Sequence, residues 1–355
     1  MGKCTHYFGS GNTAIGFVNY YESIFQNTKK AYFIVGGSNK YKTDILQKLV
    51  KKYADFYNIE IINSSIDKND IAAIKIVELN ITIVNEDLIY EKNIAINDAK
   101  IIKVDISGAV DNNVISNNSI YLEGLQKNIL KNMNNACKKF ANSLIYHEKI
   151  EGYYYKYMNF EKANKFTDEL CEEIIKDKDK DKVATTYHRF LGAATSEGPI
   201  DFVPNLTEGL KKYYLKGRSG TGKSTIIKSI ANKASRNGFD IEVYHCGFDP
   251  RSLDMVIIRE LKVAIFDSTK PHEYFKTSVN DKVIDTYTEF CEKDVDKLFK
   301  IEIDTISEEA KRYKQEAVEH LKKVIEYKEK HDDVYESALN KKKADLIIRG
   351  NLFII

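Results

Sequence analysis

The sequence predicts an α/β protein made of two tandem copies of one unit, each with a mainly parallel sheet flanked by helices and with a helical C-terminal extension. Three observations lead to this prediction: an internal repeat at a nearly constant offset, short apolar runs that alternate with segments of helical periodicity, and a long charged amphipathic stretch near the C-terminus. The 355 residues, 43% of them hydrophobic, are enough for two domains with separate cores.

The repeat extends over most of the chain. Residues 58–67 align with residues 240–249 at an offset of 182 positions (240 − 58 = 182), and the register holds to Asn85 opposite Asp267. Between the copies, lysine and aspartate alternate over residues 176–182, which is typical of a solvated helix end or a linker. We therefore predict domains at 1–180 and 187–355, joined by a charged linker at 181–186. Four N-terminal residues repeat at the same offset: His6, Phe8, Thr13 and Gly16 match His188, Phe190, Thr195 and Gly198.

In the second copy, strand and helix patterns alternate. Residues 213–215 predict a short strand, and residues 223–236 predict a helix that Gly238 ends. Residues 241–246 predict the next strand. The apolar face of the helix consists of Ile226, Ile227, Ile230 and Ala234.

The pattern continues with a further helix and strand before it becomes mostly helical. Residues 252–261 predict a helix, and residues 263–266 predict a fully apolar strand of the kind that parallel sheets bury on both faces. Beyond Val283, residues 307–340 predict a long packing helix with a highly charged outer face.

Residues 217–224 match the pattern G-x-x-x-x-G-K-[ST] at every position, between a predicted strand and a predicted helix. Such a P-loop folds its backbone N–H groups around phosphates, and the following helix adds its positive N-terminal end. We expect Lys223 to reach the β- and γ-phosphates, Ser224 to ligate Mg²⁺ and Thr225 to support the α-phosphate. The predicted nucleotide-binding residues are Gly217, Arg218, Ser219, Gly220, Thr221, Gly222, Lys223, Ser224 and Thr225.

Asp267 supplies the second half of the predicted site. It ends the apolar strand at 263–266, where a carboxylate holds Mg²⁺ through a water, as a Walker B aspartate does. Ser224 and Asp267 are therefore the predicted metal ligands.

The group that activates the attacking nucleophile is less evident, because no acid follows Asp267 directly. Candidates are Asp249 and His245, at the carboxyl end of the strand after the P-loop helix, and His272. Each also has an ordinary interpretation, since an Asp-Pro pair favours a turn and an isolated histidine is often structural. The predicted catalytic residues are Lys223, Asp267, Asp249 and His272.

The first copy differs at the positions that matter most. Lys42 and Thr43 keep the lysine and the hydroxyl, but Tyr41 replaces the tight glycine and Asn85 replaces the metal-binding acid. A tyrosine ring should obstruct the loop, and an amide cannot offset the charge of a cation. We therefore predict a degenerate copy with a structural or regulatory role. All seven arginines lie in the second copy, so an arginine acting in trans would require a homodimer.

Composition narrows the remaining choices. The net charge of +2 does not indicate nucleic-acid binding, and no segment has the apolar length of a membrane span or the form of a signal peptide. Five scattered cysteines without a C-x-x-C pair fit reduced thiols in the cytoplasm. The chain lacks the Asn-Lys-x-Asp segment that reads guanine, which favours ATP.

Taken with the P-loop, the motifs of the second copy resemble a tandem P-loop ATPase family of low-GC Gram-positive bacteria. The resemblance covers nearly the whole chain and includes the repeated His-x-Phe and Thr-x-x-Gly pairs and the segments 245–254 and 261–272. It implies two P-loop NTPase-like domains, ATP bound by Lys223 and Ser224, and Asp267 on the metal. It also implies unassigned functional roles for His245, Asp249, Asp254 and His272. The family usually has an intact P-loop in the first copy as well, so Tyr41 and Asn85 depart from its pattern, and it offers no established substrate.

The expected function is Mg²⁺-dependent ATP binding and hydrolysis at one site in the second copy, coupled to an unknown process. One alternative is a P-loop kinase that transfers the γ-phosphate to a small molecule or nucleotide, although residues 270–300 contain no arginine for a lid. The other is an ATP-sensing module with little turnover, since no glutamate follows Asp267.

Overall fold

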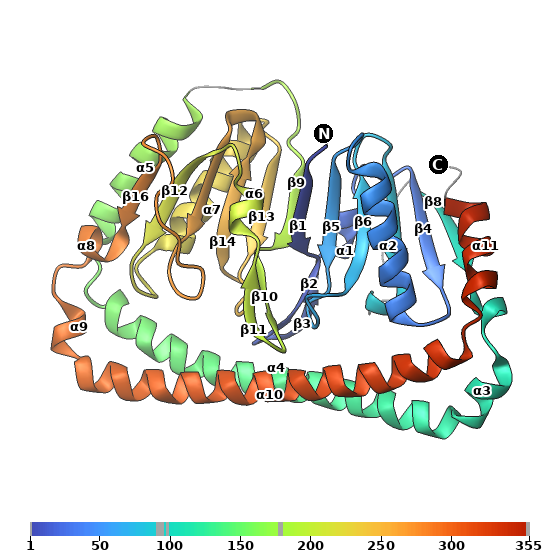
Figure 1. Ribbon diagram of the computed structural model, residues 1–355. Helices are drawn as coiled ribbons and strands as arrows, with labels where there is room; N and C mark the ends of the chain where they lie inside the picture. The colour runs from blue at the N-terminus through green and yellow to red at the C-terminus, as the bar shows by residue number, and fades with distance from the viewer. Residues whose placement is uncertain (1, 90–95, 97–98, 177–179, 353–355) are drawn as a thin grey trace.

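The computed structural model describes residues 2–89, 96, 99–176 and 180–352 (Figure 1). Within this part of the chain the protein is α/β, with a 12-stranded mixed sheet flanked by helices. Six of the eleven strand pairings in this sheet are parallel and five are antiparallel. None of the described helices combines the length and the apolar character needed to cross a bilayer.

The sheet consists of two halves with the same strand order. In the first half the order is β1 (Cys4–Phe8), β5 (Ile59–Asn63), β6 (Ile71–Ile76), β7 (Ile81–Asn85), β4 (Lys30–Val35) and β8 (Lys100–Asp105). In the second half it is β9 (Thr186–Phe190), β13 (Ile241–His245), β14 (Leu253–Ile258), β15 (Val263–Asp267), β12 (Lys211–Lys216) and β16 (Lys282–Asp285). The halves meet where β1 runs antiparallel to β9, with Phe8 opposite Phe190.

Two short hairpins stand apart from the large sheet at this junction. They are formed by β2 (Ser10–Thr13) with β3 (Gly16–Asn19) and by β10 (Gly192–Thr195) with β11 (Gly198–Asp201). Each hairpin reaches the opposite half, because Ala14 N donates to Phe248 O (2.9 Å) and Ser196 N donates to Ile66 O (3.4 Å). These contacts tie the two halves together beside the seam between β1 and β9.

One predicted element is wrong. The helix expected at 252–261 is instead β14, which lies inside the sheet between β13 and β15, with every residue buried. The run from Met255 to Ile258 contains three consecutive β-branched residues, which pack well on a pleated surface, and burial on both faces removes the polar face that a helix would show. The other elements of this region, β12, helix α7 (Lys223–Arg236), β13 and β15, lie where the sequence predicts them.

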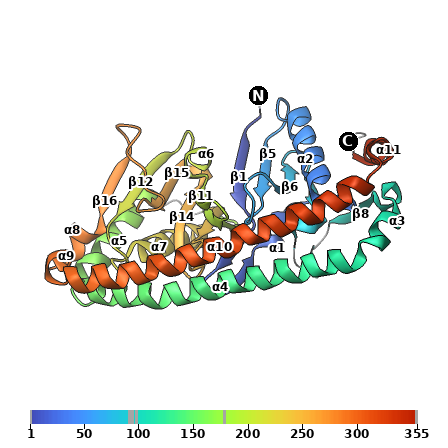
Figure 2. The same ribbon diagram turned by 60° about the horizontal axis from the view of Figure 1, so that its bottom comes forward.

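Two long helices lie below the sheet in the view of Figure 1, and each spans both halves. Helices α4 (Ser119–Tyr155) and α10 (Lys300–Ala338) lie side by side in opposite directions, and each runs from its own half to the other (Figures 1 and 2). The Ser143 hydroxyl donates to Ala310 O (2.8 Å), and Lys139 pairs with Glu316 (2.6 Å). The apolar part of their interface includes two buried clusters, one with Ala136, Phe140, Leu144, Ala317 and Leu321 and one with Ile129, Met133 and Val324.

Because each long helix runs from its own half to the other, the helix that follows it packs in the other half. Helix α5 (Phe160–Ile175), from the first repeat, packs into the core around α7, and helix α11 (Lys341–Leu352), from the second repeat, packs into the core of the first half. The same hydrogen bond marks both crossings: Asn159 N donates to Phe290 O, and Asn340 N donates to Ala109 O, both at 2.8 Å. Each half is therefore completed by a helix from the other repeat.

Candidate functional site

The predicted P-loop connects β12 to α7 at the carboxyl end of β12. Its glycines take up left-handed backbone conformations, with φ of +129° at Gly217 and +90° at Gly222. A Cβ atom at Gly217 would lie 2.3 Å from the Thr286 hydroxyl oxygen and 2.9 Å from that of Thr221, so no side chain fits there. Glycine is therefore required at this position for both conformation and space.

Lys223 lies folded over the loop. Its Nζ donates to Arg218 O (2.8 Å) and to Gly217 O (3.4 Å), and the residue is only 7% exposed. The Arg218 side chain points elsewhere, since its guanidinium pairs with Asp296 (2.6 Å). Arg218 therefore contributes its backbone to the loop, while Lys223 supplies the charge at its base.

Lys223 and Asp267 converge. The distance from Lys223 Nζ to Asp267 Oδ2 is 3.7 Å. Asp267 Oδ1 accepts hydrogen bonds from the Thr269 amide (3.0 Å) and hydroxyl (2.6 Å), which fix the orientation of the carboxylate. Ser224, the next residue of α7, accepts a hydrogen bond from Leu253 N at its hydroxyl oxygen (2.9 Å). The lysine, hydroxyl and carboxylate named by the sequence thus lie at one end of the sheet.

Asp254 adds a second carboxylate that residue patterns alone did not single out. Met255 pairs with Phe266 in the antiparallel ladder of β14 and β15, which places Asp254 opposite Asp267 on the sheet face that α7 covers. Asp254 is 8% exposed, and burial together with the charge of Asp267 raises its pKa to about 7. The helix predicted at 252–261 gave no reason to place Asp254 beside Asp267, because only a strand at these residues brings the two together.

His272 belongs to a hydrogen-bonded group with Asp201. Its Nδ1 lies 2.6 Å from Asp201 Oδ2, and the Tyr274 hydroxyl donates to Asp201 Oδ1 (2.5 Å). Burial alone would lower the pKa of His272, but the bond to Asp201 and the carboxylates of Asp254 and Asp267 raise it above its ordinary value. Asp201 lies on β11, more than sixty residues before Asp267, and no motif indicates it.

The other two candidate residues are engaged in different contacts. His245 uses both ring nitrogens, at 2.8 Å from Pro250 O and 2.9 Å from His188 Nδ1, and its ring stacks on Tyr20 at 4.3 Å. Burial lowers its pKa to about 4, so it is neutral at physiological pH. Both carboxylate oxygens of Asp249 accept hydrogen bonds from Arg251 (2.8 and 3.0 Å).

The equivalent loop of the first half has a different shape. Around the P-loop the repeat offset is 181 rather than 182, since Lys42 matches Lys223 (223 − 42 = 181). Helix α2 (Asn39–Tyr53) therefore begins at the equivalent of Gly220 (220 − 39 = 181), three residues earlier than α7 begins (223 − 220 = 3). The residues just before α7 that form part of the P-loop in the second half therefore correspond to the first turn of a helix in the first half. The Tyr41 ring was expected to obstruct the loop, but it is buried toward α11, where its hydroxyl donates to Asp345 (2.7 Å). The early start of α2, rather than the ring, removes the loop.

Carboxylates of α10 lie beside this shortened loop. Asn39 N donates to Asp332 Oδ1 (2.9 Å), and the Ser38 hydroxyl is hydrogen-bonded to Glu336. Lys42 is fully buried and paired with Asp87. A carboxylate that accepts hydrogen bonds at the start of a helix takes the place that a phosphate has in a P-loop. In the first half, the groups at the start of α2 are therefore hydrogen-bonded to side chains of the chain itself.

The first half also lacks the carboxylates of the second. At the repeat offset of 182, Asp201, Asp254 and Asp267 correspond to Asn19, Ala72 and Asn85. These three acids of the second half are therefore replaced by neutral residues at the equivalent positions.

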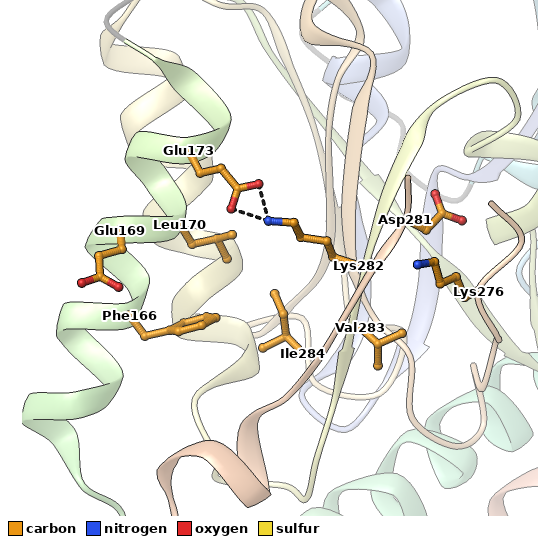
Figure 3. A pocket seen from close by; sticks show the side chains of 9 residues that line it. All are labelled: Phe166, Glu169, Leu170, Glu173, Lys276, Asp281, Lys282, Val283 and Ile284. Carbon is orange, nitrogen blue, oxygen red and sulfur yellow. Dashed lines mark hydrogen bonds and ion pairs between the residues drawn. The ribbon is translucent and has the colours of Figure 1, made fainter. Parts of the chain in front are cut away.

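A cavity of about 420 Å³ lies elsewhere, between α5 and the edge strand β16 (Figure 3). Lys282 and Glu173 on its wall form an ion pair at 2.6 Å, and none of the predicted site residues lines it. The cavity is therefore separate from the nucleotide site that the P-loop and Asp267 predict.

The buried Asp254 carboxyl predicts a pH dependence of stability. Because folding raises its pKa from about 4 to about 7, the fold favours the protonated form and loses stability as the pH rises from about 4 through 7. Asp254→Asn cannot ionise, so the free energy of unfolding of this variant, relative to wild type, should rise by roughly 2–3 kcal/mol between pH 5 and pH 8. Urea denaturation at both pH values measures this. Asp304→Asn, an exposed change on α10, is the control, and an equal difference at both pH values would contradict the assignment.

No family model, curated protein or solved structure matches this chain. The resemblance to a tandem ATPase family therefore stays a prediction.

Proposed function

We propose that the protein binds ATP with Mg²⁺ at the P-loop of its second half and hydrolyses the γ-phosphate bond. The observation that carries this proposal is the approach of Lys223 Nζ to Asp267 Oδ2 at 3.7 Å, at the base of a loop whose glycines have positive φ. A lysine and a carboxylate at the end of such a loop are the groups that nucleotide hydrolysis needs for phosphate charge and for a metal.

The donor set fits Mg²⁺. Within the described residues no cluster of three or more His, Cys, Asp or Glu side chains could enclose a metal ion. Mg²⁺ does not need such a cage, because it is usually bound by one or two protein oxygens together with phosphates and water. The Ser224 hydroxyl and the Asp267 carboxylate would hold it, and when bound it neutralises charge that develops on the phosphates.

The chain's own groups suit the remaining tasks. The Lys223 ammonium is bound to backbone carbonyls, which it can exchange for the more strongly attracting phosphate oxygens. Asp254 and His272 lie near Asp267 and can orient an attacking water. The first half offers no equivalent acids, so the proposal assigns it no catalytic role.

Asp267→Asn tests the metal-binding role. The amide keeps the shape of the side chain but loses its charge, so affinity for ATP should fall about tenfold with Mg²⁺ and change little with a chelator present. Calorimetric titration under both conditions measures this, with Asp304→Asn as the matched control. An unchanged dependence on Mg²⁺ would remove Asp267 from the site.

Product analysis separates hydrolysis from the other two candidates. A hydrolase releases one free phosphate for each ADP formed, a kinase leaves a phosphorylated acceptor, and a sensor retains bound ATP through a single-turnover experiment. We expect free phosphate to match ADP.

A further inference from the structure

Arg251 lies on the loop between β13 and β14, and this loop is fastened to the start of the P-loop helix. Leu253 N donates to the Ser224 hydroxyl oxygen (2.9 Å), and Lys228 Nζ donates to Arg251 O (2.8 Å). The backbone from Arg251 to Leu253 therefore runs along the first two turns of α7, next to the predicted phosphate site.

The Arg251 guanidinium is shared between two carboxylates. Asp249 accepts from Nε (2.8 Å) and Nη2 (3.0 Å), and Glu148, on α4 of the first repeat, accepts from Nη2 (2.9 Å). The side chains of Arg251 and Glu148 are 56% and 50% exposed. Exposed ion pairs of this kind contribute little to stability, so a ligand with stronger negative charge can displace Glu148.

Helix α4 also touches the P-loop itself. A Cβ atom at Gly220 would lie 2.8 Å from Glu151 O, so the crest of the loop packs against the backbone of α4. Residues 147–151 of α4 therefore extend from the Arg251 loop to the P-loop, and the first repeat contributes one of the two carboxylates that hold the arginine.

In the first half, side chains of α10 contact the equivalent loops, but no arginine takes part. Asp332 of α10, the equivalent of Glu151 (332 − 151 = 181), accepts from Asn39 N, and Lys328 of α10 pairs with Asp70 (3.2 Å). Arg251 corresponds to Asn69 (251 − 182 = 69). The arginine is thus specific to the half that has the intact P-loop.

We propose that Arg251 exchanges Glu148 for the terminal phosphate of the nucleotide bound at the P-loop. This inference rests on the proposed function. The guanidinium has the planar, two-pronged geometry that phosphate oxygens accept, and Asp249 continues to orient it after Glu148 is released. Glu148 competes with the nucleotide for the arginine, so the first repeat restrains ATP binding in the second. A second molecule is then not required to supply an arginine.

Affinities for ATP and ADP with Mg²⁺, measured by calorimetric titration, test the exchange. We expect Arg251→Ala to weaken ATP binding about tenfold and to leave ADP binding within about twofold, because only ATP has the γ-phosphate. Arg251→Lys should lie between Arg251→Ala and wild type. Glu148→Gln should bind ATP about threefold more tightly than wild type, since it removes the competitor. Glu309→Gln, which breaks an exposed arginine pair elsewhere on α10, is the control.

Three results would contradict the inference while the proposed function stands. The first is normal ATP affinity in Arg251→Ala together with lost binding in Lys223→Ala. The second is an equal loss of ATP and ADP affinity, which would place Arg251 away from the terminal phosphate. The third is an ATP affinity of Glu148→Gln equal to that of wild type, which would show that Glu148 does not compete with the nucleotide for Arg251. If wild type itself binds no ATP, the proposed function fails and the role of Arg251 falls with it. Circular dichroism confirms folding of each variant.

Discussion

Lys223→Ala is expected to abolish the rise in melting temperature that we expect ATP and Mg²⁺ to give to the wild type. Lys223 Nζ is held at the base of the P-loop, 3.7 Å from Asp267, and is the cation that the sequence places on the β- and γ-phosphates. A ligand at one hundred times its Kd stabilises the folded state by about 2.7 kcal/mol. Without the ammonium this stabilisation should disappear, and differential scanning fluorimetry with and without nucleotide measures the loss.

Lys42→Ala is the matched control, because it removes the equivalent lysine of the first half. Lys42 is fully buried and paired with Asp87, so the variant should melt at a lower temperature than wild type even without nucleotide. Its nucleotide-induced rise should nevertheless equal that of wild type, since the early start of α2 leaves no P-loop there. Equal loss of the rise in both variants would refute the assignment of the site to one half.

Arg189→Ala is expected to destabilise the whole molecule by about 3–5 kcal/mol. The guanidinium lies at the seam between the halves, where Nη2 is 2.7 Å from Glu60 of the first half and Nη1 is 3.3 Å from Glu242 of the second. It also lies 4.1 Å from the centre of the Tyr7 ring. Its side chain is 7% exposed, so its removal leaves two half-buried carboxylates with less compensating charge. Urea denaturation of the full chain measures the loss.

Arg312→Ala serves as the control for this prediction. Arg312 forms ion pairs with Glu309 and Glu316, but its side chain is 49% exposed on α10. Its loss should leave the midpoint of unfolding nearly unchanged. If Arg189→Ala were as stable as Arg312→Ala, the charges at the seam would not hold the two halves together.

Local signals predicted much of the second half of the fold. The P-loop motif and Gly238 set both ends of α7, which begins and ends where the sequence indicates. The strand β14 was missed because its apolar residues also fit a helical spacing, and only its position inside the sheet decides between the two. The exchange of α5 and α11 was not predictable, since an amphipathic pattern shows that a face is buried but not which half buries it.

In the candidate site, too, local motifs predicted some residues, and only the fold shows the others. Lys223, Ser224 and Asp267 follow from motif and strand order, because the ends of β12 and β15 are neighbours. Asp201 comes from a hairpin far along the chain and could be found only from the fold. The contact of Asp332 with Asn39 joins residues 293 positions apart, so no local pattern could show that the first loop is filled.

Calorimetric titration of ATP and Mg²⁺ into the wild-type chain, with free phosphate assayed on the same sample, tests the central claim most directly. The proposed single-site ATPase predicts one nucleotide bound per chain and free phosphate released in step with ADP. Two nucleotides per chain, no binding, or one bound nucleotide without phosphate release would contradict it.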